Sequence, residues 1–243
     1  MIPAGYQNWR RLLFVHWPVS AAALRPLVPS VFSIDQYDGS AYVSLVPFVI
    51  EAARPFGTPA ALGLRFLETN VRTYVHLENG ERSERSERSE RSEPGVFFFS
   101  LDAASVLAVI GARVGVGLPY YWATGRERRR PPELEYAIRR RGTSTGCYAH
   151  YVTGPFRGPA SPGSLDHFLV ERYILHAQRG PTIWSVRVHH QPYPLYEVQL
   201  RELRANLLEA AGLRNVQTPV VAHFASGVDV AIEPPRIRPR YRA

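Results

Sequence analysis

The chain contains no lysine, because all 29 of its basic side chains are arginine. A Schiff base on a side-chain amine is therefore excluded, since only lysine supplies that amine. The single cysteine, Cys147, excludes an internal disulfide bond and a cysteine-based zinc site. No window approaches the ~20 apolar residues that a membrane-spanning helix needs. We therefore expect no membrane partner, no metal site and no other cofactor.

The N-terminus also lacks a recognisable targeting signal. The first seven residues contain neither the charged region nor the apolar region of a signal peptide, so we expect a cytoplasmic protein. The 243 residues are 45% hydrophobic and 12% aromatic, which is enough for a substantial core. Because no linker divides the sequence, we expect one domain over residues 1–243.

Alternating or continuous apolar segments predict many strands and few helices. Strands are predicted at residues 9–17, 40–50, 64–77, 96–99, 134–139, 147–152, 183–189, 220–225 and 228–232. Short helices are predicted at 21–24 after Ser20, at 103–112 with Asp102 as N-cap, at 165–170 after Ser164 or Asp166, and at 200–211. This pattern indicates a predominantly β, α+β domain.

Two segments do not fit this pattern. Residues 81–93 repeat Glu-Arg-Ser four times and end in a glutamate, a composition that cannot bury apolar surface. We interpret them as a low-complexity loop insertion between turns at residues 79–80 and 94–95. The tail, residues 234–243, is rich in proline and arginine.

Clusters of arginine motivate a second function class. The formal net charge is +8, and arginines gather at residues 126–130, which we predict to be a basic loop, at 139–141 and in the tail. Such clusters favour a non-catalytic protein that binds nucleic acid or an acidic partner. No nucleic-acid recognition motif accompanies them, so this class is the alternative rather than the first hypothesis.

Three segments resemble the acetoacetate decarboxylases. Residues 23–35 (ALRPLVPSVFSID) are similar to the pattern A-L-R-x-x-V-P-x-x-x-x-I-D of that family. Residues 66–70 (FLETN) are similar to its Y-T-E-S-G segment, whose glutamate lies in the active site. Arg113 followed by Pro119-Tyr120-Tyr121 is similar to its R-E-x-x-x-x-P-K-K segment, in which the first lysine forms the Schiff base. Here tyrosines replace both lysines, and Val114 replaces the glutamate.

A larger set of segments is similar to the bacterial YqjF-like branch of this superfamily, a domain of unknown function. The segments are HWPV (16–19), NVRTYV (70–75), FFSLD (98–102), LPYY (118–121), HFLVERY (167–173) and HHQP (189–192). The resemblance covers most of the chain, from about residue 9 to residue 212. It implies a cone-shaped β-barrel of mostly antiparallel strands with a pocket inside.

The resemblance also supplies candidate site residues. It implies that Glu68, Arg113 and Tyr120 converge as the catalytic group, although they are far apart in the sequence. An arginine suits a carboxylate or carbonyl oxygen, and a glutamate in an apolar pocket can have a raised pKa and exchange protons. A tyrosine can donate to a developing enolate oxygen. The alternative for each is structural: a buried Glu–Arg pair, and tyrosines that pack with hydrogen-bonded hydroxyls.

Four further residues are candidates for ligand binding: Asn70, Arg72, Tyr121 and His16. Because neighbouring strand residues point to opposite faces, only one of the two adjacent tyrosines should face the pocket, and we expect it to be Tyr120. The first hypothesis is therefore a protein that binds a small organic carboxylate or carbonyl ligand. It includes lyase-like or isomerase-like chemistry without an imine, and it leaves homo-oligomer formation open.

Overall fold

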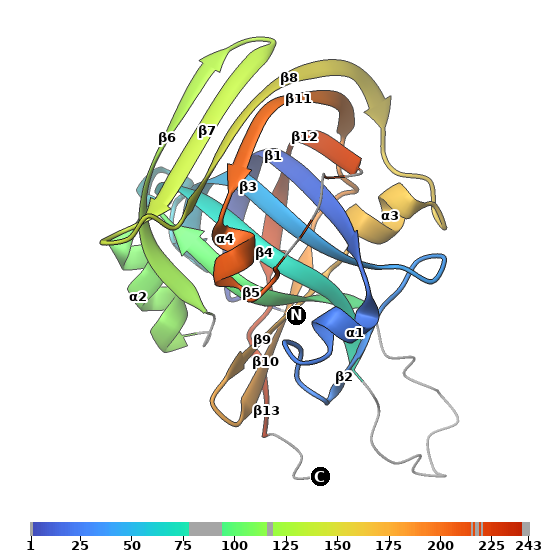
Figure 1. Cartoon of the computed structure of the whole chain (residues 1–243). Coiled ribbons are helices and arrows are strands. Elements are labelled where there is room, and N and C mark those ends of the chain that lie inside the picture. Colours follow the sequence, from blue (N-terminus) through green and yellow to red (C-terminus); the bar gives the residue numbers. More distant parts are fainter. Residues whose placement is uncertain are drawn as a thin grey trace.

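Strands dominate the computed structural model of the chain, and the helices are short (Figure 1). The structure describes residues 2–77, 94–115, 119–214, 216, 219 and 221–239, with backbone alone at 111–115 and 238–239. The predicted loop insertion at 81–93 lies outside the described residues. No helix in these ranges is long and apolar enough to cross a membrane.

The described elements follow in chain order. They are β1 (Gly5–Val19), α1 (Ala21–Leu24), β2 (Phe32–Ile34), β3 (Ala41–Pro55), the 3-10 helix η1 (Ala60–Leu62), β4 (Leu64–Leu77), β5 (Gly95–Ala103), α2 (Val106–Gly115), β6 (Tyr120–Arg130), β7 (Glu133–Arg140), β8 (Gly146–Gly158), α3 (Leu165–Val170), β9 (Ile174–Arg179), β10 (Thr182–His189), β11 (Leu195–Ala205), α4 (Leu207–Ala210), β12 (Val221–Ile232) and β13 (Arg236–Pro239).

The strand pairings close into two circuits that share one wall. The wall is the antiparallel run β12–β1–β3–β4–β5. In the first circuit, β6, β7, β8 and β11 connect β5 back to β12. In the second circuit, β9 and β10 make this connection. Among the described strands, β5 pairs in parallel with β6 and β9, and the other pairs are antiparallel. The predicted α+β fold with mostly antiparallel strands is confirmed, and the predicted barrel corresponds to these circuits.

Each circuit encloses its own apolar cluster, because side chains alternate across the shared wall. On β4, Val71 and Val75 belong to the cluster beneath β6, β7, β8 and β11. Phe66 and Tyr74 belong to the cluster beneath β9 and β10. Glu68, Asn70 and Arg72 share the parity of Tyr74, so the chemistry-bearing face of β4 points into the second circuit.

A β-bulge in β1 adjusts which side chains reach this second circuit. The pairing of β1 with β3 shifts between Arg10 and Val15, and Arg11 has φ of 52°. Trp9 and Leu12 consequently pack in the same apolar cluster, although strand residues three apart normally face opposite sides.

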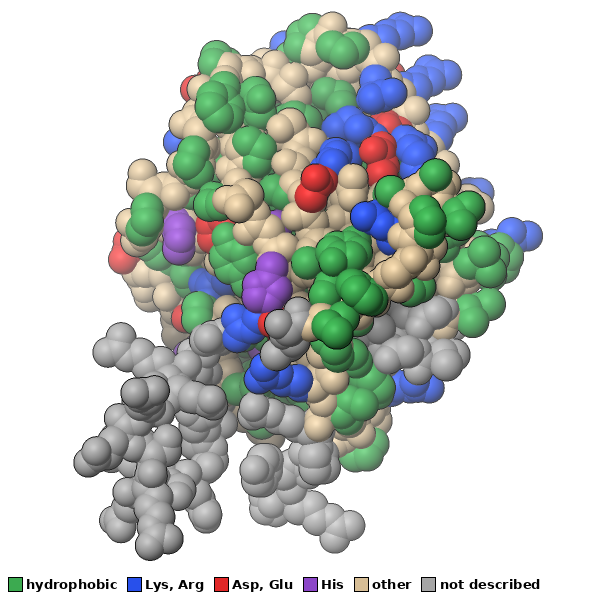
Figure 2. Space-filling model, turned by 180° about the vertical axis from the view of Figure 1, so that it is seen from behind, with side chains coloured by type: hydrophobic (Ala, Val, Ile, Leu, Met, Phe, Trp, Pro, Cys, Tyr) green, Lys and Arg blue, Asp and Glu red, His purple; other side chains and the backbone are tan. Residues whose placement is uncertain are grey.

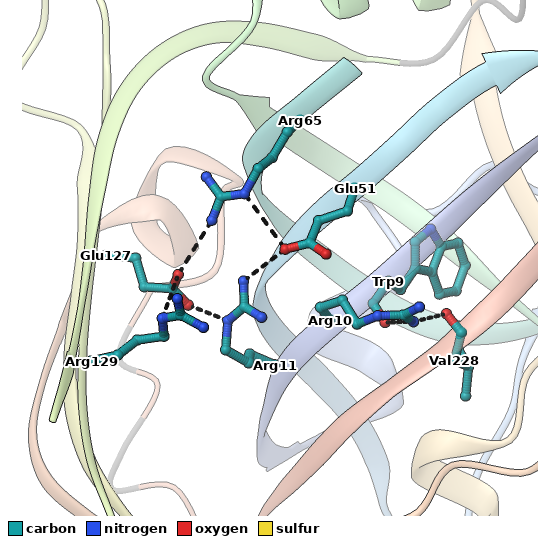
Figure 3. A network of polar contacts seen from close by, with 8 residues as sticks. All are labelled: Trp9, Arg10, Arg11, Glu51, Arg65, Glu127, Arg129 and Val228. Carbon is teal, nitrogen blue, oxygen red and sulfur yellow. Dashed lines mark hydrogen bonds and ion pairs between the residues drawn. The ribbon is translucent and has the colours of Figure 1, made fainter. Parts of the chain in front are cut away.

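The side chain of Arg11 is held beside the bulge by two carboxylates (Figure 3). Its Nε donates to Oε1 of Glu127 on β6 at 2.6 Å, and its Nη2 donates to Glu51 on β3 at 3.2 Å. Arg65 reaches the same two carboxylates at 3.6 and 3.5 Å. This network connects β6 to β1, β3 and β4 beside a residue whose backbone conformation is uncommon outside glycine.

The predicted N-cap of the helix at residues 103–112 is wrong. Asp102 belongs to β5, is fully buried, and accepts from Arg140 Nε at 2.6 Å and Nη2 at 3.2 Å. The helix begins later, at Val106, and Ser105 Oγ accepts from the backbone N–H of Ala108 at 3.2 Å. The strand continues through Asp102 because β4 and β6 pair with it on both sides.

The predicted amphipathic helix at residues 200–211 is also wrong. Residues 195–205 form β11, which pairs with β8, and only Leu207–Ala210 are helical. Leu200 and Leu203 pack on the first apolar cluster from this strand, one on each side of a register shift. Their spacing resembles that of residues on one face of a helix. The strand forms nevertheless, because its backbone pairs with the edge of β8.

Three further sequence predictions need correction. The arginine-rich segment 126–130 is not a loop but the end of β6, paired with β7. Residues 221–232 are not part of a hairpin but form the single strand β12, in which Gly227 lies so close to Trp9 that a Cβ would meet its carbonyl oxygen at 2.5 Å. Residues 236–239 of the predicted tail form β13, which pairs with β10.

Candidate functional site

The second circuit contains a cavity of about 120 Å³. Its wall combines apolar side chains such as Phe14, Phe48 and Leu101 with a few polar ones. The polar wall residues include Gln7, Glu68, Asn70, Arg72, Tyr120 and Arg172, and Trp9 and Tyr193 also line the cavity. A mostly apolar cavity with a few converging polar groups is the usual form of a small-molecule site.

Glu68 and Tyr120 meet directly in this cavity. The hydroxyl of Tyr120 donates to Oε2 of Glu68 at 2.8 Å, although the residues are 52 positions apart in the sequence. Glu68 is 2% exposed and Tyr120 is 8% exposed. The contact arises because β5 pairs with β4 on one side and with β6 on the other, which places Leu101 beside both Asn70 and Tyr120.

Burial controls the protonation of this pair. Loss of solvent raises the pKa of Glu68 from 4.5 to about 8, and the charge of Asp102 acts in the same direction. Hydrogen bonds from Tyr120 and Asn70 oppose the rise. Burial, followed by the charge of Glu68, raises the pKa of Tyr120 well above its usual value. At neutral pH Glu68 is therefore largely a neutral acid, close enough to ionisation to exchange a proton.

Arg72 brings a guanidinium group into the same cavity. The side chain is 6% exposed, and its Nη2 donates to the backbone carbonyl of Leu169 at 3.2 Å. Its Nε has no acceptor among the residues that the structure describes. The guanidinium carbon lies 5.6 and 5.9 Å from the ring centroids of Phe14 and Tyr74. A buried guanidinium with a free N–H can bind a carboxylate oxygen.

The cavity also includes residues that the sequence reasoning did not single out as site residues. Arg172 donates from Nη1 to Asp35 at 2.6 Å and from Nε to the Phe168 carbonyl at 2.8 Å. Both Arg172 and Asp35 stand in segments that carry the family resemblance, which could have identified Arg172 as a site residue. Trp9 and Tyr193 gave no comparable signal, because aromatic residues are common in any core.

The remaining predicted site residues lie elsewhere or lack a described side chain. Tyr121 is 40% exposed, with the Arg140 guanidinium carbon 3.6 Å from its ring centroid. Tyr120 thus faces the cavity and Tyr121 does not, and the ligand-binding role of Tyr121 has no support from its position. Arg113 lies in α2, but its side chain is outside the described residues, so its convergence with Glu68 stays a prediction.

His16 is fully buried near Arg72 but is not part of the cavity wall. Its Nδ1 lies 2.7 Å from Ser44 Oγ, and its Nε2 lies 3.4 Å from Nδ1 of His223. His223 Nε2 in turn lies 2.9 Å from Asp166. Burial, and then the charges of His223 and Arg72, lower the pKa of His16 well below its usual value. A direct role of His16 in ligand binding stays a prediction.

The arginines that motivated the alternative function are mostly on the surface. Arg126, Arg128 and Arg130 are exposed along β6, and Figure 2 shows arginine side chains along that edge of the molecule, with acidic side chains among them. Glu135 and Glu133 on β7 lie opposite Arg128 and Arg130 in the strand pairing. The face is therefore of mixed charge, and nucleic-acid binding stays a prediction.

The fold defines a class of protein. An acetoacetate decarboxylase from Legionella pneumophila has a similar structure, with a TM-score of 0.65 at 13% identity, over 99% of this chain and 90% of that one. The enduracididine biosynthesis enzyme MppR, in complex with the condensation product of pyruvate and imidazole 4-carboxaldehyde, has a TM-score of 0.67 at 13% identity, over 100% of this chain and 92% of that one. The protein therefore has an acetoacetate decarboxylase-like fold.

The family is given by sequence. The chain belongs to the DUF2071 family, described as an uncharacterized conserved protein, which matches residues 6–229. The uncharacterized protein YqjF of Bacillus subtilis (strain 168) is 33% identical over 233 residues, which are 95% of this chain and 90% of that protein. The predicted membership of the YqjF-like branch is confirmed.

Proposed function

We propose that the protein binds a small organic carboxylate or carbonyl compound in the cavity of the second circuit. One observation carries the proposal: Arg72, whose buried Nε has no acceptor among the described residues, lines the same cavity as the Glu68–Tyr120 pair. The first group suits the carboxylate of a ligand, and the second suits proton exchange beside it. The complex of MppR, which has a similar fold, supports a ligand related to a small keto acid.

We further propose that Glu68 and Tyr120 catalyse proton transfer at the carbon beside the carbonyl group, which is chemistry of lyase or isomerase type. In its ionised form Glu68 removes the proton, and the Tyr120 hydroxyl donates to the oxygen on which negative charge develops. The ligand stays non-covalently bound, since no lysine is present to form an imine. Glu68 and Tyr120 are buried, and burial strengthens both interactions.

Binding is tested by calorimetry with the full chain and four acids: acetate, propionate, pyruvate and lactate. We expect at least one to bind, and Arg72→Met to weaken its binding about tenfold or more, because a hydrogen bond to a charged group contributes about 1.5–3 kcal/mol. Methionine fills similar space without a charge, so the fold should persist. Arg141→Met, at a residue that stacks on exposed Trp122, is the matched control. Unchanged affinity in Arg72→Met would overturn the binding proposal.

Proton transfer is tested with the same four acids in D₂O. NMR should show exchange of the carbon-bound protons beside the carbonyl group, and Glu68→Gln should abolish this exchange while binding persists. If an acid binds but its protons exchange no faster than in buffer alone, the proposal of proton transfer is contradicted and the proposal of binding still stands.

A further inference from the structure

The cavity wall contains a second polar atom without a partner. Asn70 Oδ1 is buried and, like Arg72 Nε, has no hydrogen-bond partner among the residues that the structure describes. Both side chains line the cavity, and they are 7% and 6% exposed. The two atoms differ in kind, since an amide oxygen only accepts hydrogen bonds and a guanidinium nitrogen only donates them. A ligand that satisfies both must offer an acceptor to Arg72 and a donor to Asn70.

The orientation of the Asn70 amide follows from Glu68. The Asn70 side chain lowers the pKa of Glu68 through a hydrogen bond, as an NH₂ group directed at Glu68 would. Oδ1 has no hydrogen-bond partner among the described residues and is the atom left for a ligand. Burying an amide oxygen without a donor costs free energy, and a bound hydroxyl group would remove that cost.

The size of the cavity limits the ligand to a few atoms. An engineered protein cavity of about 150 Å³ accommodates benzene, which has six non-hydrogen atoms. The cavity here is about 120 Å³, so it accommodates a ligand of about five or six non-hydrogen atoms by the same measure. Such a ligand contains two or three carbon atoms once a carboxylate and one further polar group are counted.

The charge of the wall decides between the two common donors, a hydroxyl group and an ammonium group. Arg72 and Arg172 both line the cavity, and Arg172 is paired with Asp35, so the uncompensated positive charge of the wall is that of Arg72. An ammonium group next to Arg72 would be repelled and would lose its solvation, whereas a hydroxyl group carries no charge. The apolar side chains of Phe14 and Leu101 suit the carbon atoms of the ligand.

We infer that the ligand is a two- or three-carbon hydroxy acid whose carboxylate binds Arg72 and whose hydroxyl group donates to Asn70 Oδ1. The inference rests on the proposed function and refines it, because a keto acid would place a second acceptor against the accepting oxygen of Asn70. The hydroxy acid and the keto acid of the same carbon skeleton thus differ in one hydrogen bond at this position.

Lactate and pyruvate provide the matched test, because they have the same carbon skeleton and the same number of non-hydrogen atoms. Calorimetry with the full chain should show that one enantiomer of lactate binds about tenfold or more tightly than pyruvate. Asn70→Leu should remove this preference, whereas Asn70→Asp, which keeps an accepting oxygen at that position, should retain it. Gln199→Leu, at an exposed residue of β11, is the control and should also retain it. Alanine, which carries an ammonium group, should bind more weakly than lactate.

The outcomes separate this inference from the proposed function. Pyruvate that binds as tightly as lactate, with binding that still depends on Arg72, would overturn the hydroxy-acid inference and leave the proposed function in place. Alanine that binds as tightly as lactate would also overturn it. If no acid of the panel binds, the proposed function fails and the inference fails with it. If folded Asn70→Leu still prefers lactate, Asn70 does not accept a hydrogen bond from the hydroxyl group.

Discussion

Replacing Glu68 with glutamine should change how the stability of the protein depends on pH. The pKa of Glu68 is about 8 in the folded chain, against an ordinary value of 4.5. Between these two values the folded chain binds one more proton at this site than the unfolded chain does. The free energy of unfolding therefore falls as the pH rises, by about 1.4 kcal/mol per pH unit. The total loss from this group is about 4–5 kcal/mol, an order-of-magnitude figure, by the time the pH passes 8.

Glutamine is neutral at every pH and can still accept the hydrogen bond from Tyr120. Glu68→Gln should therefore keep the stability that the wild type loses. We expect the difference in unfolding free energy between the two proteins to be smallest near pH 5 and to grow steadily towards pH 8. Urea unfolding at several pH values measures this difference, with the slope against urea checked for constancy.

Glu197→Gln serves as the control, because Glu197 is an exposed glutamate of β11. Its stability should follow that of the wild type over the same pH range. A difference between Glu68→Gln and the wild type that stays constant from pH 5 to pH 8 would refute the raised pKa. If the unfolding free energy of the wild type instead rises relative to that of Glu68→Gln as the pH rises, Glu68 is stabilised as a carboxylate.

Two further predictions concern the wall of the second circuit. Arg11→Ala should lower the unfolding free energy by about 1–3 kcal/mol, because Glu127, with a side chain 9% exposed, loses the donor that lies 2.6 Å from it. The control is Arg129→Ala, because Arg129 is 57% exposed and lies 4.0 Å from Glu127. In the same urea assay it should cost less than about 1 kcal/mol. Because the pKa of buried His16 is lowered, the wild type should lose stability as the pH falls below about 6.5, and His16→Gln should lose less in urea melts at pH 7 and pH 5. Equal losses in either comparison would contradict the corresponding assignment.

Much of the strand arrangement could be predicted from local sequence. The alternation along residues 64–77 predicted β4 with its observed bounds, and Ser20 predicted the start of α1, where its Oγ accepts from the backbone N–H of Ala23. The helix at 165–170 was likewise predicted, with Ser164 or Asp166 as its cap, and Ser164 is the residue that accepts from His167. These elements were predictable because alternation and capping act between residues that are neighbours in the chain.

The prediction failed where a distant strand decided the local structure. Residues 195–205 became strand β11 because the edge of β8 was available for pairing, and Asp102 stayed in β5 because Arg140 of β7 compensates its buried charge. The bulge at Arg11 could not be predicted either, since arginine has no preference for positive φ. Each of these outcomes depends on a partner at least 30 positions away in the sequence.

The candidate site shows the same division. The sequence by itself determined the chemistry: no lysine for an imine, a glutamate in a segment that resembles an active-site segment, and adjacent tyrosines of which only one can face inward. Only the tertiary structure decided that Tyr120 meets Glu68 and that His16 lies outside the cavity wall. It also decided that Asn70 and Arg72 each have one buried polar atom without a partner among the described residues. Residue types are local properties, whereas burial and hydrogen-bond partners, which set the pKa of Glu68 and the polarity of the cavity, exist only after distant strands have paired.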